Sequence, residues 1–485
     1  MSLKKQALSG LVWTFAQQFS VQGISFVVSI VLARILQPSE FGIIGMIAVF
    51  VAIGNSLVSS GLTQSLIRSQ SLTQKDYSTV FFFNLMGSVV VYAIIFFAAP
   101  FIADFYNQPI LVSILRIYCL SFLIDALTSV QIARLTKDMN FKAQMIVVVP
   151  SLIISGACGV AFAYMGFGVW SLVYMTLIQK LLQTIQYWLR TKWYPSFVFS
   201  IPVFKEHFFF GYKITLAELL DSFFRNIYQV IIGRFFSPTQ VGYFTRADTI
   251  KQLPVYNISI ALKKVTYPLF SSIQHDNVKL KSAYRQVMQL TLYIVCPILV
   301  FMAVLAEPLF RFLLTAKWLP AVPYFQILCF AGILQPIHSY NLNILKIKGR
   351  SDLYLKLEIY KKIIIVASIL ATIKFGIIGL IWGQLAISIV IFFINTYYSG
   401  RFINYPTKEQ MKDIFPVVLF SLILGLLVYF LDLTLKNYKA SDLVRLIISP
   451  AIGVLLYIII SKIINLNAYN SIVSVLLKRK RVIQK

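Results

Sequence analysis

Long apolar stretches recur along almost the whole chain and are separated by short polar segments. A helix needs about 20 apolar residues to cross the ~30 Å hydrocarbon core of a bilayer, because it rises ~1.5 Å per residue. On this criterion the pattern predicts about fourteen membrane-spanning helices, near residues 10–33, 41–62, 79–101, 110–133, 144–164, 167–189, 208–233, 241–262, 286–306, 320–345, 357–375, 378–399, 414–432 and 444–464. The gaps leave no room for a folded soluble domain. The predicted fold class is therefore an all-α polytopic membrane protein.

The composition supports this class. Of 485 residues, 58% are hydrophobic and 13% are charged, against roughly 25% charged in an average soluble protein, and the mean hydropathy is +0.78. The first apolar stretch is not followed by an Ala-x-Ala cleavage pattern, so we interpret it as a retained helix rather than a signal peptide.

The positive charge of the chain is distributed unevenly among its loops. Lys and Arg number 44 against 17 Asp and Glu, a net charge of +27, and most of them fall in alternate loops and in the terminal run Lys478–Arg481. Because cytoplasmic loops carry an excess of Lys and Arg, we expect both termini in the cytoplasm. This topology, with attraction to anionic membrane lipids, accounts for the basic charge, so nucleic-acid binding is not expected.

Two segments of the chain repeat. Residues 30–42 align without gaps with residues 230–242 and share Arg, Pro and Gly at an offset of 200, while residues 116–125 align with 326–335 and place Cys119 opposite Cys329. These matches predict a six-helix lobe at 1–200, a second at 201–400, and two additional helices with a basic tail at 401–485. Six helices is an even number, so the lobes are expected to be related by a pseudo-two-fold axis along the membrane normal, as in transporters that work by alternating access.

Several motifs in this order resemble the polysaccharide-unit exporters of the multidrug/oligosaccharidyl-lipid/polysaccharide flippase superfamily. The similarity is to the Wzx group and to the branch for lipopolysaccharide or teichuronic acid biosynthesis. It is carried by R-I-L-Q-P-S-E-F-G (34–42), R-L-T-K-D-M-N-F-K (134–142), G-R-F-F-S-P-T-Q-V-G-Y-F-T-R-A-D (233–248), Y-P-L-F (267–270) and A-K-W-L-P-A (316–321). The resemblance implies a V-shaped two-lobe fold in the bacterial inner membrane. It also implies, as cargo, an undecaprenyl-diphosphate-linked oligosaccharide that is moved to the outer leaflet. Polymerases and glycosyltransferases of the same pathway are the implied partners; a monomer is compatible with the sequence.

Ionisable residues lie inside the predicted seventh and eighth helices. Glu218, Asp221 and Arg225 are spaced three and four residues apart and so share one helical face. On the next helix, Asp248 and Lys251 are placed to pair with each other, and Arg246 lies apart from them. A charge at the bilayer centre costs at least ~2.5 kcal/mol, so such residues tend to face water or a partner.

Two interpretations of these charges stay open. Arg225 and Arg246, with Lys251 and Arg116 as weaker candidates, line a cationic cavity that grips the cargo diphosphate, since a guanidinium binds phosphate oxygens bidentately; Asp221 and Glu218 are then cavity or coupling residues. Alternatively, Asp221 pairs with Arg225 and only fastens helices. Asp125 and Lys180 lie nearer the cytoplasmic ends of their helices, where snorkelling toward the interface is the simpler account.

Bond chemistry is not expected from this chain. The four cysteines and three histidines show no metal-ligand spacing, no catalytic constellation is evident, and no cofactor is implied. Two other functions compete with flipping of a saccharide: a drug or cation antiporter of the same superfamily, and an integral-membrane glycosyltransferase or polymerase. Such antiporters often carry an embedded carboxylate in the first lobe, whereas the first helix here has only Gln17 and Gln18. A glycosyltransferase or polymerase would be expected to have a sizeable acidic outer loop, and the outer loops here are short.

Overall fold

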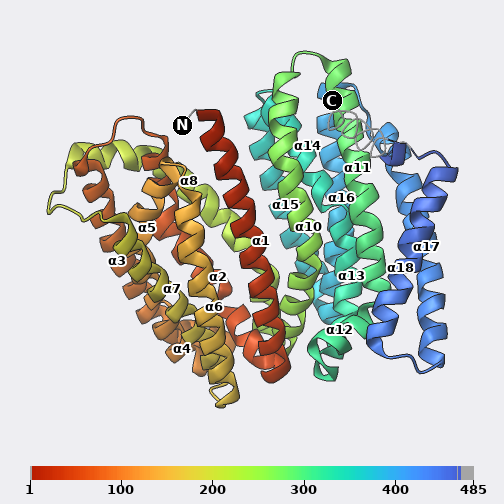
Figure 1. Cartoon of the computed structure of the whole chain (residues 1–485), viewed down its shortest axis with the longest axis horizontal. Helices are drawn as coiled ribbons and strands as arrows, with labels where there is room; N and C mark the ends of the chain where they lie inside the picture. The colour runs from red at the N-terminus through yellow and green to blue at the C-terminus, as the bar shows by residue number, and fades with distance from the viewer. Residues whose placement is uncertain (1–2, 467, 471–485) are drawn as a thin grey trace. The chain divides into compact units, whose positions relative to one another are not determined.

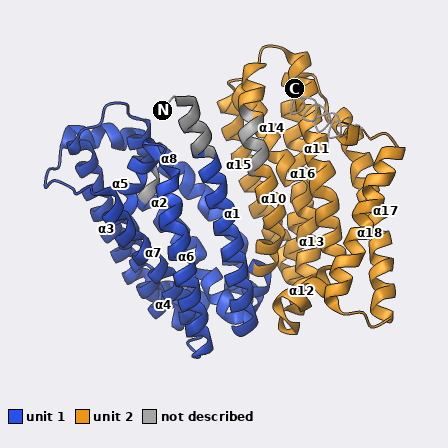
Figure 2. Cartoon of the chain, viewed as in Figure 1, with its two compact units in different colours: residues 1–245 blue, residues 246–485 orange. Residues whose placement is uncertain are grey.

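The computed structural model describes residues 3–466 and 468–470, and throughout these residues the regular structure is helical. The basic run Lys478–Arg481 lies outside the described residues. The chain forms two compact units, 1–245 and 246–485, whose boundary falls within one long helix (Figure 2). The predicted division into lobes at residue 200 stays a prediction.

Unit 1 is a bundle of long helices that run beside one another (Figure 1). Its helices are α1 (Leu3–Ile35), α2 (Pro38–Arg68), α3 (Gln74–Tyr106), α4 (Ile110–Tyr118), α5 (Leu120–Lys137), α6 (Phe141–Tyr164), α7 (Val169–Thr191), α8 (Ile201–Arg225), α9 (Ile227–Phe235) and the start of α10 (Pro238–Ser272). An aromatic and aliphatic core from α2, α3, α5 and the segment after α7 holds the bundle together; it includes Leu66, Phe81, Val130 and Trp193.

Unit 2 contains the rest of α10, followed by α11 (Asn277–Val304), α12 (Ala306–Leu314), a 3-10 turn at Ala316–Ala321, α13 (Val322–Ile333), α14 (Gln335–Ile347), α15 (Ser351–Thr372), a short 3-10 turn, α16 (Gly376–Ile403), α17 (Thr407–Asn437) and α18 (Asp442–Ile463). The last two helices lie side by side at one edge of the unit (Figure 1). They are not an independent appendage, since α17 packs on α11 and Tyr457 of α18 donates a hydrogen bond to the Tyr293 carbonyl at 3.0 Å.

Local sequence signals set where the helices begin. The backbone N–H of Gln37 donates to the Glu40 carboxylate at 2.6 Å, and that of Thr73 donates to Asp76 at 2.8 Å. These are the reciprocal contacts of a capping box, which satisfy backbone donors that an α-helix leaves free in its first turn. Asp276 performs a similar function for α11, where its side chain accepts from two backbone N–H groups.

Ten segments of the described chain are long and apolar enough to cross a membrane. One of them, 351–403, holds α15 and α16, which pack against each other, so it is long enough to cross twice. The helices α7, α8 and α10 are also long but fall outside the ten because they carry more polar residues. The class of polytopic helical membrane protein is confirmed; the number fourteen stays a prediction.

Several of the predicted continuous spans are broken. The fourth is divided between α4 and α5 at Cys119, and the seventh between α8 and α9 at Asn226. At the second break the Asn226 amide donates to the Ser222 carbonyl at 2.7 Å. This bond satisfies a backbone acceptor at the point where the helix stops, as a low-dielectric environment demands.

Candidate functional site

Helix α8 is fastened to α2 along most of its length. Near one end, Gly61 and Gly211 bring the two backbones together so closely that a Cβ on Gly61 would lie 2.3 Å from the Gly211 carbonyl oxygen. Farther along, the hydroxyls of Ser56 and Ser222 are 3.2 Å apart and both residues are buried. This close packing fixes the face of α8 that carries Glu218 relative to α2.

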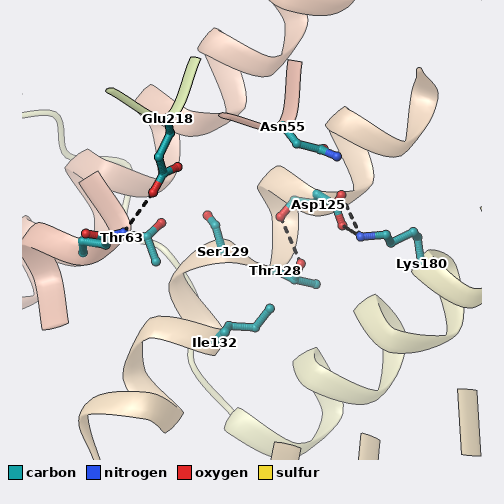
Figure 3. A pocket seen from close by; sticks show the side chains of 9 residues that line it. Asn55, Thr63, Asp125, Thr128, Ser129, Ile132, Lys180 and Glu218 are labelled. Atoms are coloured by element: carbon teal, nitrogen blue, oxygen red, sulfur yellow. Dashed lines mark hydrogen bonds and ion pairs between the residues drawn. The ribbon is translucent and has the colours of Figure 1, made fainter. Parts of the chain in front are cut away.

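A pocket of about 470 Å³ opens between α2, α5, α7 and α8. This volume is within the ~300–1,000 Å³ typical of small-ligand sites. Eight of its nine lining residues are polar; the full lining is Asn55, Thr63, Gln64, Asp125, Thr128, Ser129, Ile132, Lys180 and Glu218 (Figure 3). Such a lining is unusual in a chain that is 58% hydrophobic, and it suits a ligand rich in hydrogen-bonding groups.

One wall of the pocket is an ion pair between α5 and α7. The Lys180 ammonium donates to both carboxylate oxygens of Asp125, at 2.7 and 2.9 Å (Figure 3). Snorkelling toward the interface stays a prediction for these two side chains, and the structure adds that they pair with each other at the pocket. The turn that carries Asp125 is held by a bond from the Thr128 hydroxyl to the Asp125 carbonyl at 3.0 Å.

Helix α8 contributes Glu218 to the lining of the pocket. The Glu218 carboxylate lies 3.4 Å from the Gln64 amide nitrogen, a long contact that bridges α8 and α2. Behind the pocket, Asn84 of α3 donates to the Ser129 hydroxyl at 3.0 Å. The pocket is thus assembled from polar groups that come from four helices, and among its lining residues only Glu218 belongs to the predicted site.

The other predicted site residues of unit 1 do not line this pocket. Arg225 is exposed and donates to the Ser222 hydroxyl, one turn back on its own helix, at 3.2 Å. Asp221 is also exposed. The Arg116 guanidinium stacks on the Phe96 ring, with its central carbon 4.2 Å from the ring centroid, a cation–π contact that needs no anionic partner.

The remaining two predicted residues belong to unit 2. Arg246 is 7% exposed, and its guanidinium carbon lies 5.5 Å from the ring of the buried Trp318. The Lys251 ammonium donates to Asp248 at 2.6 Å, so the predicted pairing of these two residues is confirmed. Whether these cations contact a diphosphate stays a prediction.

A second pocket, of about 380 Å³, lies in unit 2 between α12, α13, α17 and α18. Its charged residues are engaged with one another: Arg445 donates to both oxygens of Asp432 at 2.9 and 2.7 Å, and Lys436 contacts Glu307 at 3.1 Å. We therefore interpret this charge cluster as the fastening of the last two helices.

Comparison with known proteins places the chain among proteins of polysaccharide assembly. A family model described as "Polysaccharide biosynthesis protein" matches residues 31–323, which is more than half of the chain. A teichuronic acid biosynthesis protein of Bacillus subtilis, TuaB, is 26% identical over 490 residues and 99% of both chains. A lipopolysaccharide biosynthesis protein of Escherichia coli, WzxC, is 23% identical over 82% of this chain and 81% of its own length.

Solved structures show the same fold at low sequence identity. The lipid II flippase MurJ in an inward closed conformation superposes with a TM-score of 0.75 and 14% identity, covering 96% of this chain and all of that one. An inward-facing multidrug resistance transporter of the MATE family gives a TM-score of 0.61 and 17% identity, covering 79% of this chain and 95% of that one.

Proposed function

Because the chain belongs to this family of polysaccharide biosynthesis proteins, we propose that it flips a lipid-linked oligosaccharide from the cytoplasmic to the outer leaflet of the inner membrane. The observation that carries the proposal is the polar pocket embedded in unit 1, where eight hydrogen-bonding side chains line a cavity in an apolar helical bundle. A saccharide presents many hydroxyl groups, and its transfer across a bilayer requires that water around those groups be replaced by protein donors and acceptors.

The named relatives support the transport of a lipid-linked saccharide, and the fold is compatible with it. TuaB and WzxC are named for polysaccharide assembly, and MurJ is named as a flippase of a lipid-linked precursor. The MATE fold is shared by drug transporters, so the fold alone does not select the cargo; membership of the polysaccharide family favours the saccharide over the antiporter alternative. The same relatives favour transport without bond chemistry.

The finer features of the proposal rest on the charges in the sequence and on its resemblance to polysaccharide-unit exporters. Both termini are cytoplasmic, the lipid carrier is undecaprenyl diphosphate, and transport proceeds by alternating access of two lobes. Arg225 and Arg246 are the proposed contacts of the diphosphate, with Arg116 and Lys251 in support. A polymerase and the glycosyltransferases of the pathway act on either side of the transport step.

Reconstituted protein tests the transport step. Proteoliposomes loaded with a fluorescent undecaprenyl-diphosphate-linked oligosaccharide should expose label from the inner leaflet to a membrane-impermeant quencher, faster than protein-free liposomes do. Mass spectrometry should recover the lipid-linked saccharide unchanged. Equal rates with and without protein, or new glycosidic bonds made by the protein alone, would overturn the proposal.

Export in a deletion strain tests the diphosphate contacts. A charge-assisted hydrogen bond contributes about 1.5–3 kcal/mol, so Arg225→Gln or Arg246→Gln should lower export by roughly tenfold to a hundredfold. Arg190→Gln, at the exposed end of α7, is a matched control. Normal export by the double variant at normal membrane levels would eliminate the diphosphate clamp.

A further inference from the structure

The charges that line the unit 1 pocket do not balance. Its lining contains two carboxylates, Asp125 and Glu218, and one ammonium, Lys180. Because Lys180 contacts both oxygens of Asp125, at 2.7 and 2.9 Å, those two charges cancel within one wall. The nine lining residues therefore carry one net negative charge, which belongs to Glu218.

Glu218 is also the carboxylate of the pocket whose acceptor capacity is least used. Its contact with the amide nitrogen of the exposed Gln64 measures 3.4 Å, which is long beside the usual 2.9–3.0 Å of an N–H···O bond. An ionised carboxylate offers about four lone-pair positions and no donor. It is therefore suited to accept hydrogen bonds from a ligand and unsuited to face another anion.

The uncharged lining residues also favour a neutral ligand with hydrogen-bonding groups. Asn55 and Thr63 present an amide and a hydroxyl, which both donate and accept, while the Thr128 and Ser129 hydroxyls donate to the Asp125 and Ala126 carbonyls and so face the pocket as acceptors (Figure 3). A neutral pyranose ring offers hydroxyls that donate to Glu218 and to these acceptors, and oxygens that accept from the amide and the Thr63 hydroxyl. A uronate ring of the same size brings a carboxylate instead, and like charges repel more strongly in a low-dielectric pocket than in water.

We propose that this pocket receives uncharged or amino-substituted sugar rings of the cargo, and that Glu218 excludes rings that carry a carboxylate. Selection of this kind is a difference between two affinities, obtained here by a repulsive element rather than by extra contacts. The inference rests on the proposed function, since it assigns part of a saccharide cargo to the pocket. It also places the cargo diphosphate outside the pocket, because the same net negative charge opposes any anion.

Two methyl glycosides that differ at one carbon provide the test. Methyl β-D-glucopyranoside and methyl β-D-glucuronide share the ring and differ by a hydroxymethyl group against a carboxylate, and neither has a tail that partitions into lipid. Their dissociation constants are measured by saturation-transfer NMR on the full chain in nanodiscs of zwitterionic lipid at pH 7. We expect the glucuronide to bind at least about tenfold more weakly than the glucoside.

Two variants identify the group responsible. Glu218→Gln removes the charge and keeps the shape, and should bring the two dissociation constants within about twofold of each other. Glu206→Gln is the matched control, since Glu206 is exposed on the same helix and does not line the pocket; it should keep the wild-type ratio.

Equal binding of the two glycosides by the wild type, no binding of either, or an unchanged ratio in Glu218→Gln would overturn the inference. If Glu218→Gln does not yield folded protein, Glu218→Ala removes the same charge, and an unchanged ratio in that variant overturns the inference. A different result would refute the proposed function. If the protein discriminates between the glycosides but flips no lipid in proteoliposomes, the pocket still selects sugars and the transport role is refuted.

Discussion

Replacing Asp432 by Asn breaks a buried ion pair between the last two helices of unit 2. The side chains of Arg445 and Asp432 are 3% and 9% exposed, and the guanidinium grips both carboxylate oxygens at 2.9 and 2.7 Å. Removing one partner of such a pair leaves the other charge buried without compensation, at a cost of about 3–5 kcal/mol. The Asp442 carboxylate, 3.1 Å from the same guanidinium, still compensates part of the charge, so we expect about 3 kcal/mol for Asp432→Asn.

Substitution of the other partner, Arg445, should destabilise the protein more. Arg445→Met leaves the buried Asp432 without its cation and takes from Asp442 the nearer of its two, since Arg311 remains 3.7 Å away. Its cost is therefore expected near the upper end, at about 5 kcal/mol. At roughly 2–4 °C per kcal/mol for a unit of this size, melting temperatures should fall by roughly 6–12 °C for Asp432→Asn and 10–20 °C for Arg445→Met. The double variant, which removes both buried charges, should be more stable than the sum of the single costs predicts.

Thermal unfolding in detergent can be followed with a thiol-reactive fluorogenic dye, because Cys296 and Cys329 of unit 2 are buried in the folded protein. Lys279→Met is the matched control: its pair with Asp276 has a similar distance, 3.0 Å, but the lysine is 74% exposed, and exposed pairs contribute about 0–1 kcal/mol. A melting temperature for Asp432→Asn within about 2 °C of the wild type, or strict additivity in the double variant, would refute the reasoning.

Three further predictions concern unit 1 and the topology. Gly61→Ala should lower the yield of folded protein and its transport rate because the new Cβ would meet the Gly211 carbonyl at 2.3 Å, whereas Gly87→Ala, with no atom within 4 Å of the new Cβ, should leave both unchanged; equal yields and rates would contradict the close packing of α2 and α8. Asp125→Lys should impair flipping in proteoliposomes and adding Lys180→Asp should restore part of it, since the pair of opposite charges is re-formed across 2.7 Å; no recovery in the double variant would argue against a role for the pair itself. Reporter fusions test the orientation inferred from the charge pattern: those after Lys142, Lys205, Lys281 and Arg350 should read cytoplasmic and those near Asn107, Pro238 and Lys317 external, and a cytoplasmic signal at Pro238 would contradict the two-repeat topology.

Features that depend on the order of neighbouring residues were predictable from the sequence. The helical membrane class follows from the length of the apolar stretches, and the pairing of Asp248 with Lys251 follows from their spacing of three residues on one helix. The repeat was also visible in the sequence, because each copy is a short run of residues that can be aligned without knowing the fold. In the structure its two copies contact each other reciprocally, since a Cβ on Gly42 would meet the Pro238 carbonyl and one on Gly242 the Pro38 carbonyl.

The candidate site depended on the tertiary structure. Asp125 and Lys180 are 55 residues apart in the chain and Gln64 and Glu218 are 154 apart, so no periodicity within one helix relates them. Each of these residues taken alone is compatible with snorkelling or a solvated helix face, and only the packing of α2, α5, α7 and α8 brings them to one pocket. The breaks at Cys119 and Asn226 are similar, because a uniformly apolar stretch does not show where neighbouring helices and side-chain amides will satisfy the backbone groups of an interrupted helix.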